Sequence, residues 1–198
     1  MRYHDLAVPL RIAAAAGVAS GAILILNAAK RADLVPTSSL TQLLAPLAEI
    51  FAVLFVTALY LRHGRRAGLL GLLGFLLNFL GLAALVGVEF VINLVFAALP
   101  TATVTDLRAG PLGVALTVSS LVFLVGTLTY CAALATQRAV PRVALACYAV
   151  GAIPVALRAA VPEGVLDAAL VVMAAGVVWL GIWLWRDSRA PIQHTVSA

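Results

Sequence analysis

The chain has 198 residues, of which 64% are hydrophobic and 11% are charged, and its mean hydropathy is +1.10. A water-soluble domain of this length cannot bury so much apolar surface, so the composition excludes a soluble globular protein. The formal net charge of +5 comes from cations scattered over short polar segments rather than gathered in one stripe. This scatter argues against a nucleic-acid-binding protein.

The apolar runs, taken in chain order, predict about six transmembrane helices. A helix needs about 20 apolar residues to cross the hydrocarbon layer, and long Leu, Ala, Val and Gly runs without period-two alternation favour helices over strands. The expected spans are residues 12–29, 39–61, 67–99, 112–135, 140–160 and 165–185. We therefore predict a single all-α membrane domain over residues 1–198, a polytopic helical bundle.

The third run, residues 67–99, is longer than a simple crossing requires. We expect one tilted helix. The alternatives are a break near Gly87 or an interfacial end around residues 96–100.

The distribution of Lys and Arg predicts that both termini lie in the cytoplasm, because cytoplasmic segments retain positive charge. With the N-terminus inside, nine cations lie on the inner side and four on the outer side. The inner cations are Arg2, Arg11, Arg62, Arg65, Arg66, Arg138, Arg142, Arg186 and Arg189, and the outer ones are Lys30, Arg31, Arg108 and Arg158. Four acids also fall on the outer side, namely Asp33, Asp106, Glu163 and Asp167, against Asp5 and Asp187 on the inner side.

Two acidic residues fall at membrane depth, where each ionisable group costs roughly 2.5 to 3.5 kcal/mol on insertion scales. Glu49 lies near the middle of the second span, and Glu89 lies in the outer part of the third. Steps of seven or eleven residues return to one helix face, so Gln42 shares a face with Glu49, and Asn78 shares one with Glu89. Asn93 follows one turn after Glu89. These five residues are the candidates for ligand binding or proton coupling.

The turn near Gly64 joins the second and third helices into an antiparallel hairpin, in which residues whose numbers sum to about 128 lie at equal depth. This arithmetic places Glu49 opposite Asn78 near the bilayer centre and Gln42 near Glu89 toward the outside. The predicted Glu49–Asn78 contact has two interpretations. It is either a buried hydrogen bond that joins two helices, or part of a site in which Glu49 exchanges protons or binds a ligand while Glu89, Gln42 and Asn93 line an outward cavity. A wet interfacial position for Glu89 is a third alternative.

Small residues predict where helices approach closely. Gly74 and Gly81 flank Asn78 on its face of the third helix. The first helix carries a similar seam of Ala13, Gly17 and Gly21, which makes it a candidate neighbour.

Two cysteines and three histidines leave little material for a metal site or haem ligation, so we expect no metal and no cofactor. The hydroxyl groups within the spans, such as those of Ser119, Ser120 and Thr127, lack an accompanying base. We therefore predict no catalytic residues, and an enzyme is the less favoured class.

Several short motifs are spread over residues 72–189. They read Gly-Phe-Leu-Leu-Asn at 74–78, Gly-Val-Glu-Phe at 87–90, Ala-Ala-Leu-Pro at 97–100, Gly-Pro-Leu at 110–112, Arg-Ala-Val-Pro-Arg at 138–142 and Trp-Leu-Gly-Ile-Trp-Leu-Trp at 179–185. In these motifs the chain resembles small six-helix integral membrane proteins of actinobacteria that have no assigned function. The resemblance implies a multi-pass protein of the bacterial plasma membrane and transfers no catalytic residues.

The leading functional hypothesis is binding or transport of a small apolar or amphipathic solute with an intramembrane carboxyl. The alternatives are a structural or assembly subunit of a larger membrane complex, and an intramembrane enzyme with a Glu general acid. The expected partners are the lipid bilayer, a small apolar ligand, and either further copies of the chain or a larger membrane complex.

Overall fold

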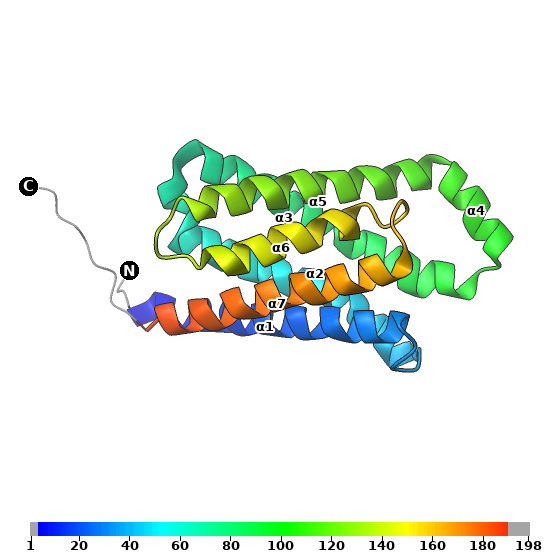
Figure 1. The fold of residues 1–198 in the computed structure, drawn as a ribbon, viewed down its shortest axis with the longest axis horizontal. Helices are drawn as coiled ribbons and strands as arrows, with labels where there is room; N and C mark the ends of the chain where they lie inside the picture. Colours follow the sequence, from blue (N-terminus) through cyan, green and yellow to red (C-terminus); the bar gives the residue numbers. More distant parts are fainter. Residues whose placement is uncertain (1–3, 190–198) are drawn as a thin grey trace, which may run out of the picture.

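The computed structural model describes the backbone of residues 4–189 and the side chains of residues 7–189. Arg2 and the side chain of Asp5, which contribute to the charge count above, lie outside the described residues. Every regular element of the described chain is helical, and the long helices pack into a bundle (Figure 1). The predicted all-α class is confirmed.

Six helices make up the body of the bundle. They are α1 (His4–Arg31), α2 (Ser39–Arg62), α3 (Gly68–Phe90), α5 (Pro111–Ala135), α6 (Arg142–Ala156) and α7 (Glu163–Asp187). Figure 1 shows that α1 begins and α7 ends at the same end of the bundle, which we call the terminal end. The opposite end, where α1 ends and α7 begins, is called the distal end.

Within residues 4–189, five segments are long and apolar enough to cross a membrane, which is the architecture of a multi-pass membrane protein. They are Ala7–Arg31, Ser39–Arg62, Gly64–Ala98, Pro111–Ala135 and Glu163–Asp187. The remaining expected span corresponds to α6, an apolar helix of 15 residues. At 1.5 Å per residue α6 is about 22 Å long, so it is shorter than the hydrocarbon layer of about 30 Å.

The third run is continuous rather than broken at Gly87, which lies inside α3. A 3₁₀ turn, η1 (Gly64–Ala67), precedes α3. A π-helical turn, η2 (Val91–Val95), and a 3₁₀ turn, η3 (Phe96–Ala98), continue it at the distal end. The departure from α geometry therefore begins directly after Phe90, close to Glu89 and around Asn93.

A short helix that the sequence analysis did not predict, α4 (Thr101–Ala109), follows the third run. Pro100 precedes it and Gly110 ends it, after which α5 begins at Pro111. Its side chains are mostly exposed, and it lies beyond the distal end of the other helices (Figure 1). A polar nine-residue segment without an apolar stripe gives no periodic signal, which is why it was missed.

The start of α2 at Ser39 follows from a capping box. The Ser38 N–H donates to Thr41 Oγ1 at 2.9 Å, and the Thr41 N–H donates to Ser38 Oγ at 3.3 Å. These bonds satisfy backbone donors that no helical carbonyl can reach.

Helices α3 and α5 approach each other through glycines. A Cβ added at Gly81 would lie 2.4 Å from the Cα of Phe123, and one added at Gly126 would lie 2.3 Å from the backbone N of Asn78. One added at Gly74 would lie 2.7 Å from the N of Tyr130. The predicted close approach at Gly74 and Gly81 is confirmed, but the neighbour is α5 rather than α1.

The small-residue seam of α1 packs elsewhere. A Cβ at Gly21 would lie 2.5 Å from Val178 Cγ2 of α7, and one at Gly17 would lie 2.6 Å from the Phe55 ring of α2. The expectation that α1 covers Asn78 is therefore wrong, because α1 uses this face against α7 and α2.

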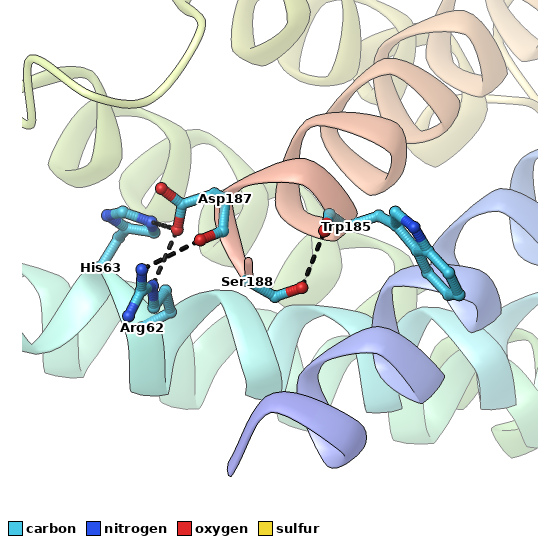
Figure 2. A network of polar contacts seen from close by, with 5 residues as sticks. All are labelled: Arg62, His63, Trp185, Asp187 and Ser188. Carbon is cyan, nitrogen blue, oxygen red and sulfur yellow. Dashed lines mark hydrogen bonds and ion pairs between the residues drawn. The ribbon is translucent and has the colours of Figure 1, made fainter. Parts of the chain in front are cut away.

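A cluster of Arg62, His63 and Asp187 joins α2 to α7 at the terminal end (Figure 2). Arg62 Nε lies 2.7 Å from Asp187 Oδ2, and His63 Nε2 lies 3.0 Å from the same oxygen. Arg62 Nη2 also donates to the backbone carbonyl of Asp187 at 3.1 Å. The ring of Trp183 packs on His63 with 4.8 Å between centroids. These contacts fix the end of α7 against the end of α2.

Candidate ligand-binding cavity

A cavity of about 150 Å³ lies between the helices in the distal half of the bundle. All six long helices and the π turn contribute to its lining. Its polar lining residues are Ser20, Asn27, Lys30, Arg31, Glu49, Glu89, Asn93, Ser120, Tyr148 and Arg158. The volume matches that of an engineered protein cavity that binds benzene, so it suits a ligand of roughly six to ten non-hydrogen atoms.

Helical spacing explains why the cavity has a polar and an apolar wall. On α1 the lining residues are Ser20, Leu24, Asn27, Lys30 and Arg31, and on α7 they are Leu166, Leu170, Met173 and Val177. Both sets repeat at intervals of three and four residues and therefore form one stripe on each helix. The stripe on α1 carries polar groups, whereas the stripe on α7 is apolar. A ligand in this cavity would meet both kinds of surface.

Glu49 lies deep in the cavity wall. It follows the first residue of α2, Ser39, by ten positions, which is about 15 Å along the helix from the distal end. Its Oε2 atom is buried and has no hydrogen-bond partner among the described residues. The same is true of Asn27 Oδ1 on α1. Burying a polar atom without a partner is costly, and for a charged group the cost is larger, so these two acceptors are the least satisfied part of the cavity.

The polar groups around Glu89 form a connected network of hydrogen bonds. Lys30 Nζ donates to Asn93 Oδ1 at 2.9 Å, and Asn93 Nδ2 donates to Glu89 Oε2 at 2.8 Å. Arg158 Nη1 donates to Glu89 Oε1 at 3.2 Å. This network joins α1 to the π turn η2 and to the residues after α6. The two cations of this network, Lys30 and Arg158, each have an acceptor within the protein.

Arg31 also has acceptors, both supplied by α7. Its Nε donates to Asp167 Oδ1 at 2.9 Å, and its guanidinium also pairs with the exposed Glu163. These pairs join the distal end of α1 to the first turns of α7, beside the cavity.

Three of the five residues singled out from the sequence line this one cavity, namely Glu49, Glu89 and Asn93. Gln42 and Asn78 are outside its lining. Glu89 is paired with Asn93 and Arg158, and no bond joins it to Gln42 among the described residues. The structure therefore brings together the two intramembrane acids and one amide, but not through the expected contacts.

Asn78 is fully buried and is bonded away from Glu49. Its Nδ2 donates to Thr127 Oγ1 of α5 at 2.8 Å and to the Tyr148 hydroxyl of α6 at 3.4 Å. The predicted Glu49–Asn78 hydrogen bond is therefore wrong. Equal depth in a hairpin does not set helix rotation, and the glycines beside Asn78 turn this face of α3 toward α5. Asn78 holds three helices together and supports Tyr148, which lines the cavity.

The sequence analysis missed Asn27 and Tyr148, and it treated Lys30, Arg31 and Arg158 as markers of topology. A signal for the α1 residues was present, because Ser20, Asn27 and Arg31 are separated by seven and eleven positions and so share a face. For Tyr148 no comparable signal exists, since its place depends on the packing of α6 against α5 and α7.

Comparison of the chain with protein-family models, with curated proteins and with solved structures gives no match. Within residues 4–189, no group of three or more His, Cys, Asp or Glu side chains is placed to hold a metal ion. What the site can do chemically therefore follows from its geometry: it can enclose a small molecule and accept hydrogen bonds from it.

Proposed function

We propose that this is a multi-pass protein of the bacterial plasma membrane that binds a small amphipathic solute in the distal cavity, as a binding protein or a transporter. The observation that carries the proposal is the buried, unpartnered Oε2 of Glu49 in the wall of a cavity whose opposite wall is apolar. Small-molecule sites in proteins have this composition, a mostly apolar hollow with a few polar groups.

The energetics favour a binding role for Glu49 over a role in joining helices. An ionisable group at membrane depth costs roughly 2.5 to 3.5 kcal/mol, and a structural acid offsets such a cost by bonding to its neighbours. Glu89 does so with Asn93 and Arg158. Glu49 leaves an oxygen unpartnered among the described residues, and a bound solute would satisfy it.

For the orientation, we propose that both termini lie in the cytoplasm, as the excess of Lys and Arg on that side supports. The cavity then lies toward the outer face. Single cysteines at the exposed positions 65 and 106, in a background without Cys131 and Cys147, test this orientation. In intact cells a membrane-impermeant maleimide should label Asp106→Cys and not Arg65→Cys. The opposite pattern would contradict it.

Ligand-dependent thermal unfolding in lipid nanodiscs tests the binding proposal. Amphipathic compounds of about six to ten non-hydrogen atoms are the probes, and at least one should raise the unfolding temperature of the wild type. Ala52→Leu, which adds volume to the cavity lining, should abolish that rise. Ala22→Leu, on the exposed side of α1, is the matched control and should preserve it.

If the wild type and Ala52→Leu respond identically to every probe, the cavity is not a binding site. If the purified protein then carries a stoichiometric protein partner and no solute, the assembly-subunit alternative replaces this proposal.

A further inference from the structure

We propose that the solute is a small organic cation, an ammonium group on an apolar body, whose N–H groups donate to Glu49 and Asn27. This inference rests on the proposed function, because it names the chemical class that the same cavity would take. Hydrogen-bond inventory, charge and geometry each support it.

The unpartnered oxygens in the cavity call for a ligand that donates hydrogen bonds. Four buried side-chain polar atoms in the described part of the chain lack a partner: Arg11 Nε, Asn27 Oδ1, Glu49 Oε2 and Asn78 Oδ1. Of the residues that carry them, Asn27 and Glu49 line the cavity, and both of their unpartnered atoms are oxygens. An oxygen acceptor is satisfied by an N–H or O–H group, so a ligand that only accepts hydrogen bonds would leave both atoms unpaired.

The existing pairing of the charged groups favours a cation over a neutral donor. Around the cavity each cationic side chain already bonds to an acceptor, as described for Lys30, Arg31 and Arg158. Two carboxylates line the cavity, those of Glu89 and Glu49, and Glu89 is paired with Arg158. Glu163 and Asp167 lie outside the lining and are paired with Arg31. The carboxylate without a cationic partner among them is Glu49. An anionic ligand would have to displace an existing pair, whereas an ammonium group would complete one.

The antiparallel arrangement of α1 and α2 turns the two acceptors toward each other along the bundle. Because α1 ends at Arg31 and α2 begins at Ser39, residues whose numbers sum to about 70 lie at equal depth. Asn27 is then about six residues, or 9 Å, nearer the distal end than Glu49. Side chains tilt toward the N-terminus of their own helix, so Asn27 tilts down into the bundle and Glu49 tilts up toward it. An ammonium group carries three donors and can contact both.

The apolar part of the proposed solute would lie against α7. Leu170, Met173 and Val177 line that side of the cavity, together with Phe123 of α5. The cavity of about 150 Å³ limits the body to about the size of a phenyl ring or a short alkyl chain. A larger amine, such as one with a second ring, should not enter.

Four probes of nearly equal shape test the inference: benzylamine, benzyl alcohol, benzoate and toluene. Binding to the protein in nanodiscs is measured by titration calorimetry at pH 7. Benzylamine should bind at least tenfold more tightly than any of the other three. Glu49→Gln should weaken benzylamine at least tenfold and change benzyl alcohol less than threefold, which also shows that the variant is folded. Asn27→Leu should weaken benzylamine by about threefold to tenfold.

Glu163→Gln is the matched control, since it makes the same change of acid to amide at an exposed position outside the cavity lining. Its affinity for benzylamine should stay within threefold of the wild type. A comparable loss in Glu163→Gln and Glu49→Gln would show that overall charge, not the cavity carboxyl, determines the affinity, and would overturn the inference.

The failure of this inference is distinguishable from the failure of the proposed function. If benzyl alcohol, benzoate or toluene binds as tightly as benzylamine, the cavity binds small solutes but does not select a cation, and only the inference fails. If none of the four binds and Ala52→Leu behaves as the wild type throughout, both fail, and water alone satisfies Glu49 and Asn27.

Discussion

Asp187 at the terminal end and Glu49 in the distal cavity are two acids on long helices of the same bundle, and their surroundings differ. One oxygen of Asp187 lies within 3.0 Å of both Arg62 and His63 (Figure 2), whereas Oε2 of Glu49 has no partner among the described residues. The first arrangement holds two helices together. The second leaves an oxygen of Glu49 that no described residue bonds, and the proposed binding role rests on this difference.

The two halves of the bundle differ in the same way. Toward the terminal end, the hydroxyl of Tyr130 donates to the carbonyl of Val56 at 3.0 Å, and the ring of Tyr60 stacks on Phe75 with 4.2 Å between centroids. Toward the distal end the helices enclose the cavity instead. In the proposed orientation the protein is packed on the cytoplasmic side and hollow on the outer side.

Replacing the satisfied acid should have the largest effect on stability. Asp187→Asn keeps the shape of the side chain but removes the charge that Arg62 and His63 face. We expect the free energy of unfolding to fall by about 2 kcal/mol, because hydrogen bonds to charged groups contribute more than neutral ones. Denaturant titration in mixed micelles measures it. Asp106→Asn, at an exposed position on α4, is the control and should change stability by less than about 0.5 kcal/mol.

Replacing Glu89, the acid of the hydrogen-bond network at the distal end, should have an intermediate effect on stability. Glu89→Gln weakens the bonds to Arg158 and Asn93, but the Arg158 side chain is 30% exposed, so water compensates part of the loss. The expected decrease is about 1 kcal/mol in the same titration. A decrease as large as that of Asp187→Asn would mean that the hydrogen bonds of Glu89 stabilise the bundle as much as the Arg62–His63–Asp187 cluster does.

Replacing the unpartnered acid should have the smallest effect. Glu49→Gln removes a group with an unsatisfied oxygen, so without added solute the stability should stay within about 0.5 kcal/mol of the wild type or rise. Glu49→Gln and Asp187→Asn both change an acid to its amide, so the difference between their stabilities reports the difference between the two surroundings. If Glu49→Gln is destabilised as much as Asp187→Asn, Glu49 has a structural partner and the contrast between the two regions is wrong.

The helices of the bundle were predictable because each is marked by a local apolar run. The predicted spans overlap all six long helices, and Ser39 was placed correctly as the first residue of α2. What local patterns did not predict was the departure from α geometry at Val91–Val95 and the polar helix α4. Neither has a distinctive hydrophobic period, since both depend on how the chain turns at the distal end.

The cavity was predictable only in part, for a different reason. Spacing along one helix and depth within one hairpin identified Glu49, Glu89 and Asn93 as polar residues at membrane depth. Contacts between helices distant in sequence were not accessible in this way. The backbone approach of Gly126 to Asn78 decides which face of α3 meets α5, and Arg158 reaches Glu89 across 69 positions. Such contacts depend on the rotation and order of the helices, which a single sequence does not report.

The shortness of α6 affects the lipid around the protein. A helix of about 22 Å is roughly 8 Å shorter than the hydrocarbon layer, and such hydrophobic mismatch is accommodated by local thinning of the bilayer. Tyr148, which lines the cavity, is eight residues before the last residue of α6, or about 12 Å along the helix. Where α6 crosses the membrane, the thinned bilayer beside it would, under the proposed function, leave a solute less hydrocarbon to cross on its way from water to Glu49.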